Sequence, residues 1–260
     1  MGDSTHGSLS ATTIHIAGAG GDQIEAYLAR PEGTGKRGAV VVIHHMPGYD
    51  RASKEITRRF AELGYDAICP NLHYREAPGA APDDASAASR AAGGVPDDRL
   101  VGDVRGAMDY LRSLPGSNGK VGCIGYCSGG RQTVLAACHL DLDAAVDCYG
   151  AFVTGTPPEG WPVPMPNLVA LLPDLHCPLL GLFGADDKTP SPAHVDELSR
   201  LLTEHGKHFE MHSYPDTGHG FFAVDRPAYR VAAANDGWDK IATFFGKYLA
   251  TETENTDVHL

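Results

Sequence analysis

The sequence predicts an α/β fold in which helices flank a mostly parallel central sheet. Uninterrupted apolar runs, of the kind that suit strands buried on both faces, recur along the chain. Between them lie segments in which apolar residues are spaced three or four apart, as on one face of a helix. Because strand–helix–strand units connect by right-handed crossovers, the strands that they join run parallel.

The predicted elements follow one another without interruption. The strand candidates are GAVVVIHHM, YDAICPN, KVGCIGY, DAAVDCYG, PLLGLFG and HFEMHSY. The helical faces are Ile56, Phe60 and Leu63; Leu100, Val104, Ala107, Met108 and Leu111; Val195, Leu198, Leu201 and Leu202; and Trp238, Ile241, Phe244, Phe245 and Tyr248. A further helix follows KVGCIGY and runs to about Cys138.

At the N-terminal end, TTIHIAG and QIEAYLARP flank GAGGD, which predicts an antiparallel hairpin. The glycines of this turn precede a strand rather than a helix, so they do not fit a dinucleotide-binding loop. Residues 73–96 are rich in Ala, Gly, Pro and Asp, and we expect a long loop with one short helix, which in compact domains is often a functional lid. No repeat or linker divides the sequence. We therefore expect a single domain over residues 1–260, with flexible tails at 1–10 and 251–260.

Charge and composition exclude several classes of partner. The formal net charge of −12 argues against nucleic acid and against an anionic membrane surface, because either would be repelled on average. No segment approaches the roughly 20 apolar residues of a membrane span, and the first residues do not resemble a secretory signal. The six cysteines lack paired short spacings and are expected to be reduced thiols. These observations predict a cytoplasmic protein.

The stretch GYCSGG, residues 125–130, lies where a predicted strand meets a predicted helix. A strand, a Gly-x-nucleophile-x-Gly turn and a helix form the nucleophile elbow of α/β-hydrolases. Side chains at Gly125 and Gly129 would collide with neighbouring elements, and Cys127 at the apex would project outward. Ser128 would offer its backbone N–H to an oxyanion hole. The alternative is a Gly-rich turn that holds a buried cysteine as a small apolar residue.

A nucleophile of this kind needs a base, and the base needs an orienting acid. In α/β-hydrolases the chain order is nucleophile, acid, histidine. Asp186 and Asp187 follow the strand candidate PLLGLFG, and His219 stands in the glycine-flanked loop TGHGFF after the last strand. Taken alone, His219 is equally well explained as a surface histidine, one of 13 in the chain. Its position after the elbow and the aspartates favours the base.

Four motifs together resemble the dienelactone hydrolase family, the carboxymethylenebutenolidases: GYCSGG, GADD, TGHGFF and CPNLHYREAPG. The resemblance extends from the first long apolar run to the C-terminal helix. It implies the α/β-hydrolase fold, a catalytic triad of Cys127, Asp187 and His219, and oxyanion-hole amides at Met46 and Ser128. It also implies hydrolysis of a small ester or lactone through a thioester acyl-enzyme.

One position departs from the family pattern. Dienelactone hydrolases have a glutamate just before the first oxyanion residue, where it takes part in activating the thiol, and this sequence has His45. A histidine is not a permanent anion, so this position does not supply a carboxylate. His45 could hydrogen-bond the thiol, pair with it as a second histidine, or contact the substrate. Alternatively, His44 and His45 are packing residues at the end of the strand.

The family also uses arginines to hold the carboxylate of the substrate, bidentately where geometry allows. Arg75 and Arg90 in the long loop and Arg226 after the histidine are the candidates, and Tyr126 beside the elbow is a candidate pocket residue. The alternatives are that the arginines are solvated surface charges and that Tyr126 is a packing residue.

Two other classes of function fit parts of the sequence. The histidine count raises the question of a metal site, but no HxxxH pattern with a carboxylate partner is present, and no cofactor motif is found, so we expect neither a metal nor a cofactor. A non-hydrolytic ligand-binding protein or a redox-responsive thiol protein is the alternative to a hydrolase. The expected partner is a small ester or lactone, and the expected assembly is a monomer or a homodimer.

Overall fold

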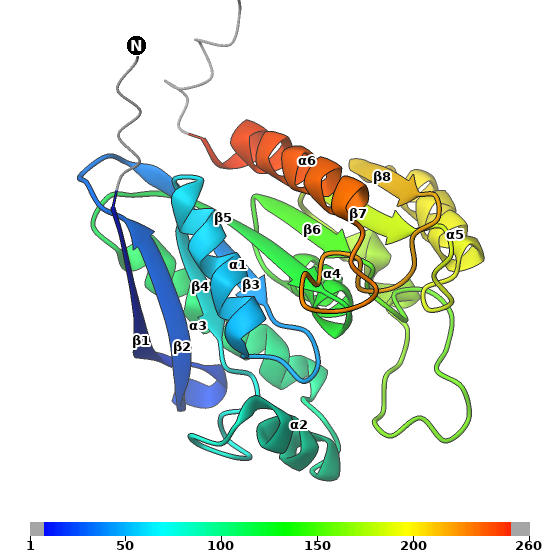
Figure 1. The fold of residues 1–260 in the computed structure, drawn as a ribbon, viewed down its shortest axis with the longest axis horizontal. Coiled ribbons are helices and arrows are strands. Elements are labelled where there is room, and N and C mark those ends of the chain that lie inside the picture. Colours follow the sequence, from blue (N-terminus) through cyan, green and yellow to red (C-terminus); the bar gives the residue numbers. More distant parts are fainter. Residues whose placement is uncertain (1–7, 251–260) are drawn as a thin grey trace, which may run out of the picture.

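The protein is described by a computed structural model of residues 8–250, in which eight strands form one sheet of order β1-β2-β4-β3-β5-β6-β7-β8 (Figure 1). The strands are β1 (Leu9–Ala17), β2 (Gln23–Pro31), β3 (Arg37–Ile43), β4 (Asp66–Pro70), β5 (Ser117–Tyr126), β6 (Ala144–Cys148), β7 (Leu179–Gly184) and β8 (Phe209–Tyr214). Strands β3 to β8 pair in parallel, whereas β1 and β2 pair antiparallel to each other, and β2 is antiparallel to β4. The predicted α/β fold with an N-terminal antiparallel hairpin is confirmed.

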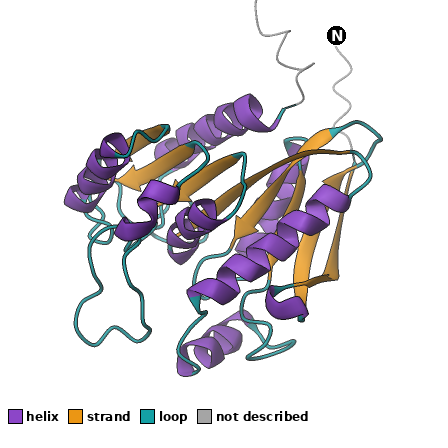
Figure 2. Ribbon diagram, turned by 180° about the vertical axis from the view of Figure 1, so that it is seen from behind, coloured by secondary structure: helices purple, strands orange, loops and turns teal. Residues whose placement is uncertain are grey.

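Helices cover both faces of the sheet (Figures 1 and 2). The helices are α1 (Arg51–Glu62), α2 (Pro82–Ala91), α3 (Asp97–Ser113), α4 (Ser128–His139), α5 (Pro192–Glu204) and α6 (Val231–Leu249), with two 3-10 segments, η1 (Ala19–Gly21) and η2 (Val169–Asp174). Helices α1 and α6 lie on one face, where Phe60 of α1 packs against Trp238 and Phe245 of α6 at ring-centroid distances of 5.4 and 5.8 Å. Helices α3 and α4 lie on the other face. The helices therefore bury both sides of the central strands, and Val40 to Ile43 of β3 are fully inaccessible.

Two sequence expectations concern the ends of the chain and the long loop. Leu9 and Ser10 belong to β1, where Leu9 pairs with Pro31. The rest of the tails expected at residues 1–10 and 251–260 lies almost entirely outside the described part of the chain, which excludes residues 1–7 and 251–260. The expected short helix within residues 73–96 is α2. None of the helices between residues 8 and 250 has the length and apolar character that crossing a bilayer requires.

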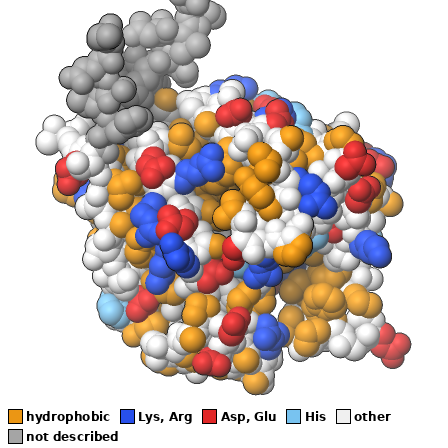
Figure 3. Space-filling model, viewed as in Figure 1, with side chains coloured by type: hydrophobic (Ala, Val, Ile, Leu, Met, Phe, Trp, Pro, Cys, Tyr) orange, Lys and Arg blue, Asp and Glu red, His pale blue; other side chains and the backbone are white. Residues whose placement is uncertain are grey.

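On the face formed by α1 and α6, acidic, basic and apolar side chains are intermingled (Figure 3). The net negative charge of the chain is therefore not gathered there into one extended patch. The parallel strands end at a common edge of the sheet, and the loops after β3, β5, β7 and β8 meet there (Figure 1). In open α/β sheets this edge is where ligands bind.

The junction between β5 and α4 is packed at backbone contact distance. A Cβ placed on Gly125 would lie 2.0 Å from the carbonyl oxygen of Gly129, and one on Gly129 would lie 2.4 Å from the carbonyl oxygen of Ile43 at the end of β3. Backbone atoms cannot yield as a flexible side chain can, so both positions require glycine. The sequence prediction that these glycines avoid collisions is confirmed.

Gly129→Ala should lower the free energy of unfolding by about 1–3 kcal/mol, because the added methyl group overpacks a backbone contact. Gly246→Ala is the matched control: Gly246 lies in α6 with no atom within 4 Å of a would-be Cβ, and alanine favours the helix by up to about 1 kcal/mol. Urea denaturation of both variants measures the difference. Equal stability of Gly129→Ala and the unmutated protein would contradict this account of the junction.

Candidate active site

Cys127 lies at the apex of the bend between β5 and α4. Its backbone adopts φ 56° and ψ −120°, a strained conformation for a residue with a side chain. Hydrogen bonds hold the bend on both sides: the Cys127 N–H donates to the Cys148 carbonyl at 3.0 Å, and the Gly130 N–H donates to the Cys127 carbonyl at 3.0 Å. Cys127 is partly exposed, whereas the other five cysteines are buried. The alternative of a walled-in cysteine therefore does not describe this residue.

His219 and Asp187 are brought together from two loops at the same edge of the sheet. The Nδ1 atom of His219 lies 2.8 Å from Oδ2 of Asp187. The second oxygen of Asp187 accepts a hydrogen bond from the Thr189 N–H at 2.8 Å, so the buried carboxylate is fixed at both oxygens. Its neighbour Asp186 is exposed and makes no such contact to the imidazole.

The side chain of Cys127 lies beside the imidazole of His219 at the same cavity and interacts with it, so the three side chains form one connected group. Burial by itself would lower the pKa of His219. The hydrogen bonds to Asp187 and Cys127, together with the negative charge of both partners, outweigh that effect and raise the pKa to about 10. The raised pKa means that the imidazole of His219 is held in its protonated form at neutral pH.

An aromatic cluster holds the histidine in place. The ring of Tyr149 meets the imidazole edge-to-face at a centroid distance of 5.0 Å, and it packs on Phe221 at 5.2 Å. Tyr149 follows β6 directly and itself adopts a positive φ of 45°. Sequence reasoning missed this residue. The available signal was its place immediately after a buried strand, at the edge where the other strands supply their site residues.

The two residues with proposed oxyanion amides, Met46 and Ser128, come from the loop after β3 and from the start of α4. Ser128 is the first residue of α4, so its N–H has no acceptor within the helix. Met46 lines the same cavity as Cys127. The contact of Gly129 with the end of β3 brings these two segments together.

His45 also lines this cavity, and it is paired with a carboxylate. Its Nε2 atom lies 3.0 Å from Oδ2 of Asp50, the residue that caps α1 through a hydrogen bond from the Ser53 N–H at 2.9 Å. Burial would raise the pKa of Asp50, but the hydrogen bonds from His45 and Ser53 hold it well below the usual range. Position 45 therefore lacks the family's carboxylate. The carboxylate of Asp50 is bonded to His45 instead and does not itself line the cavity.

The structure does not bring Arg75 to the cavity. Its guanidinium makes two contacts of 2.9 Å with Asp103 and one of 3.0 Å with Asp22, and both partners are distant from Arg75 in the sequence. Asp103 is fully buried, and a buried carboxylate requires a cation or hydrogen-bond donors. The expectation that Arg75 binds substrate is corrected: this arginine neutralises a buried aspartate.

Arg90 is likewise away from the cavity. It lies on α2, exposed, and donates to Oγ of Ser86 at 2.6 Å; the Ser86 hydroxyl in turn donates to Sδ of Met46 at 2.8 Å. The expectation of a direct contact between Arg90 and substrate is corrected as well, because the side chain lies along α2 and contacts Ser86.

The cavity at Cys127 has a volume of about 670 Å³. Apolar and aromatic residues and two histidines line it together with charged residues: His45, Met46, Ile56, Tyr126, Cys127, Tyr149, His219, Phe222, Ala223, Val224 and Trp238, and the charged Arg51, Glu55, Arg59, Glu62, Asp225 and Arg226. Tyr126, His45 and Arg226, the remaining candidates for substrate binding, all line this cavity. Tyr126 is buried and forms part of the wall.

Two arginines that sequence reasoning missed reach the same cavity. Arg51 and Arg59 lie on one face of α1, together with Glu55, at a spacing of four residues. The guanidinium of Arg59 stacks 3.9 Å above the ring of Trp238, which fixes it at the cavity wall. The sequence could have indicated them, because they lie on the charged face of the amphipathic helix that directly follows the segment with Met46.

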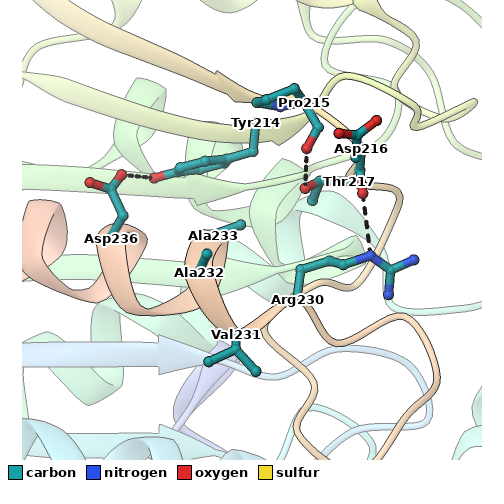
Figure 4. A pocket seen from close by; sticks show the side chains of 9 residues that line it. All are labelled: Tyr214, Pro215, Asp216, Thr217, Arg230, Val231, Ala232, Ala233 and Asp236. Atoms are coloured by element: carbon teal, nitrogen blue, oxygen red, sulfur yellow. Dashed lines mark hydrogen bonds between the residues drawn. The ribbon is translucent and has the colours of Figure 1, made fainter.

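A second hollow, of about 620 Å³, lies between the loop after β8 and the start of α6 (Figure 4). Two pairs of its polar groups bond to each other: the Tyr214 hydroxyl donates to Asp236 at 2.8 Å, and Nε of Arg230 donates to the Asp216 carbonyl at 3.2 Å. It contains no nucleophile and no histidine. Among residues 8–250, no three His, Cys, Asp or Glu side chains are grouped in a way that could hold a metal ion.

The family model described as "Dienelactone hydrolase family" matches residues 24–249, which is nearly the whole described chain. The chain belongs to the dienelactone hydrolase family. A relative from Salmonella typhimurium, named "Putative carboxymethylenebutenolidase", is 34% identical over 249 residues, covering 93% of this chain and 89% of the relative. The "Carboxymethylenebutenolidase" of Pseudomonas putida is 30% identical over 204 residues, covering 75% and 79%. Its membership of this family identifies the protein as a hydrolase.

Solved structures agree with the family's fold. A crystal structure from Klebsiella pneumoniae, described as a "Putative Dienelactone Hydrolase", superposes with a TM-score of 0.82 at 29% identity, covering 93% of this chain and all of that one. A dienelactone hydrolase-like promiscuous phosphotriesterase from metagenomic libraries gives 0.74 at 19% identity, covering 94% of this chain and all of that one. The second likeness shows the fold alone.

The raised pKa of His219 predicts a pH-dependent contribution to stability. A group with a raised pKa in the folded state contributes fully below its ordinary pKa of 6.5, and the contribution is lost as the pH rises through about 10. The free energy of unfolding of the unmutated protein minus that of His219→Gln should therefore shrink between pH 6.5 and 10. Urea denaturation at a series of pH values measures it. Asp187→Asn, which removes one cause of the raised pKa, should move the loss to lower pH, and a difference independent of pH would contradict the assignment.

Proposed function

We propose that this protein is a cysteine hydrolase of a small ester or lactone and that it acts through a thioester acyl-enzyme. The observation that carries the proposal is the connected chain of Asp187, His219 and Cys127 at a cavity large enough for a small organic molecule. The order of the three residues along the sequence is that of the α/β-hydrolases.

In the acylation step, His219, oriented by Asp187, holds the proton taken from Cys127. The thiolate attacks the substrate carbonyl carbon, a C–S bond forms, and the carbonyl oxygen becomes an oxyanion. Collapse of this intermediate breaks the C–O ester bond, and the imidazolium gives its proton to the departing oxygen. With a lactone, the departing oxygen stays attached to the acyl group.

In the deacylation step, His219 takes a proton from water, and the resulting hydroxide attacks the thioester carbonyl. The C–S bond breaks, the acid leaves, and the thiolate–imidazolium pair is restored. In both steps the backbone N–H groups of Met46 and Ser128 stabilise the oxyanion, and each such donor typically contributes about 3 kcal/mol to the reduction of the barrier.

The walls of the cavity suggest the kind of substrate. Trp238, Phe222 and Ile56 offer an apolar surface to the body of the molecule. Arg226 and Arg59 offer guanidinium groups at the wall, where the carboxylates of Glu55, Glu62 and Asp225 also lie. We propose that the substrate carries an anionic group, held by these arginines rather than by Arg75 and Arg90. A small molecule of this kind is the only partner that the proposal requires.

His45 completes the proposed site. Since its Nε2 faces Asp50, Nδ1 is the nitrogen left to hydrogen-bond the substrate or the thiol. The alternative of a redox-responsive thiol is less well supported, because the other five cysteines are buried and none is placed in the cavity as a resolving thiol.

Cys127→Ala should abolish hydrolysis of p-nitrophenyl acetate and of a panel of lactones while the protein stays folded, because Cys127 is the only thiol among the residues that line the cavity. Cys138→Ala is the control, since this thiol is buried in α4 away from the cavity, and its turnover should match that of the unmutated protein. Release of p-nitrophenol and circular dichroism measure the two properties. Retained turnover in Cys127→Ala would overturn the proposal.

His45→Ala should lower kcat/KM by roughly 10- to 100-fold, as expected for a hydrogen bond to a charged group worth about 1.5–3 kcal/mol. Stability should change less, because His45 is partly exposed and its partner Asp50 keeps its bonds to Ser53. Steady-state kinetics and thermal unfolding separate the two effects. A variant with the rate of the unmutated protein would discard a site role for His45.

A further inference from the structure

The peptide unit between His45 and Met46 is held at its carbonyl end. Nδ1 of His44 lies 3.0 Å from the carbonyl oxygen of His45. The N–H of the same peptide unit is the proposed oxyanion donor of Met46. A trans peptide is planar, and its C=O and N–H point in opposite directions. Fixing the oxygen on one side therefore fixes the direction of the N–H on the other.

A second contact shows which nitrogen of His44 carries the proton. The backbone N–H of Leu72 points to Nε2 of His44 at 3.3 Å. A backbone N–H only donates and a carbonyl oxygen only accepts, so Nε2 must be the acceptor and Nδ1 must carry the hydrogen. Both contacts require the same neutral tautomer. The imidazole thus links the loop after β4 to the peptide of the proposed oxyanion hole.

The surroundings of His44 preserve this neutral state. The side chain is buried, and its ring meets that of His73 edge-to-face at a centroid distance of 4.9 Å. Burial, together with the neighbouring His73, lowers the pKa of His44 to about 3. The donor to the His45 carbonyl is therefore retained over the whole neutral range, independently of the titration of His219.

Gly48 provides an independent observation at the same contact. It adopts a φ of 70°, and a Cβ on it would lie 1.8 Å from Nδ1 of His44 and 2.1 Å from the carbonyl oxygen of His45. The chain turns back directly over this hydrogen bond, and any side chain at position 48 would push its two atoms apart. The turn is built around the contact.

We propose that His44 is a positioning residue, which orients the Met46 N–H toward the oxyanion by holding the His45 carbonyl. The inference rests on the proposed function, since it assigns His44 a role in the oxyanion hole of that same site. It differs from the role of His45, whose side chain lines the cavity, because the side chain of His44 is not among the groups that line it. A histidine that only packs in the core would serve stability and leave the rate of acylation unaffected.

The test compares His44→Leu, His44→Asn and the unmutated protein with p-nitrophenyl acetate as the probe. Leucine keeps the bulk and removes the donor, whereas the amide nitrogen of asparagine stands near the position of Nδ1. His139→Leu is the matched control: its Nδ1 contacts the Leu135 carbonyl at 2.9 Å at the end of α4, outside the cavity. Stopped-flow kinetics give the acylation rate, steady-state kinetics give kcat and KM, and iodoacetamide gives the alkylation rate of Cys127, which needs no oxyanion hole.

We expect His44→Leu to lower the acylation rate and kcat by roughly 10- to 100-fold, below the 10²- to 10³-fold loss of a whole oxyanion donor, with KM nearly unchanged. Alkylation by iodoacetamide should stay within about twofold of the unmutated rate. His44→Asn should recover most of the acylation rate, and His139→Leu should match the unmutated protein. A folded His44→Leu that acylates at the unmutated rate, or that loses alkylation and acylation equally, would overturn the inference and leave the proposed function intact.

If His44→Leu does not fold, His44→Gln takes its place, because glutamine offers its amide near Nε2 and not near Nδ1. Its acylation rate should then lie well below that of His44→Asn, and equal rates for the two amides would overturn the inference. If the unmutated protein shows no turnover that depends on Cys127, the proposed function itself fails, and the role of His44 falls with it.

Discussion

The first turn of α4 and the end of β3 are in backbone contact, with no room for a side chain between them. A Cβ at Gly129 would lie 2.4 Å from the Ile43 carbonyl oxygen, and one at Gly125 would lie 2.0 Å from the Gly129 carbonyl oxygen. Because the two segments touch, the bend that carries Cys127 stands beside the loop that carries Met46. The proposed nucleophile and its proposed oxyanion donors are thus placed by the packing of the sheet, and the strained backbone at Cys127 is tolerated because hydrogen bonds hold both sides of the bend.

Around this contact, three carboxylates are paired with a cation or an imidazole. Asp187 faces His219, Asp50 faces His45, and Asp103 faces Arg75. A carboxylate removed from water is costly unless it is paired, and these three acids meet that cost with a cation or an imidazole. Asp147 shows the cost where no cation is present: it is fully buried, it accepts only the Gly150 N–H, and burial raises its pKa to about 7. The same rule has opposite consequences at different places. At the cavity, the pairing gives His219 and His45 a carboxylate partner. Away from the cavity, it holds Arg75 against Asp103, so that this arginine does not reach the substrate.

The sequence predicted the alternation of strands and helices, the hairpin, the elbow and the order of Cys127, Asp187 and His219. These features are local, since each depends on a glycine pattern, an apolar run or a position directly after a strand. The arginines were harder to predict because their partners are remote in sequence. Arg75 pairs with Asp103 and Asp22, which are distant in sequence, and no residue near Arg75 in the sequence indicates this pairing. Arg59 reaches the cavity by stacking on Trp238 of a different helix.

By itself, then, the sequence determined the fold class, the family and the three side chains proposed for catalysis, because strand ends, tight turns and chain order are written in consecutive residues. Only the tertiary structure decided which charged and polar side chains can contact a ligand in the cavity. Arg75 is paired with Asp103, and Arg90 donates to Ser86. Asp50 pairs with His45, and Nδ1 of His44 contacts the carbonyl oxygen of His45. These outcomes depend on burial and on contacts between distant segments, and neither is encoded in any short stretch of the chain.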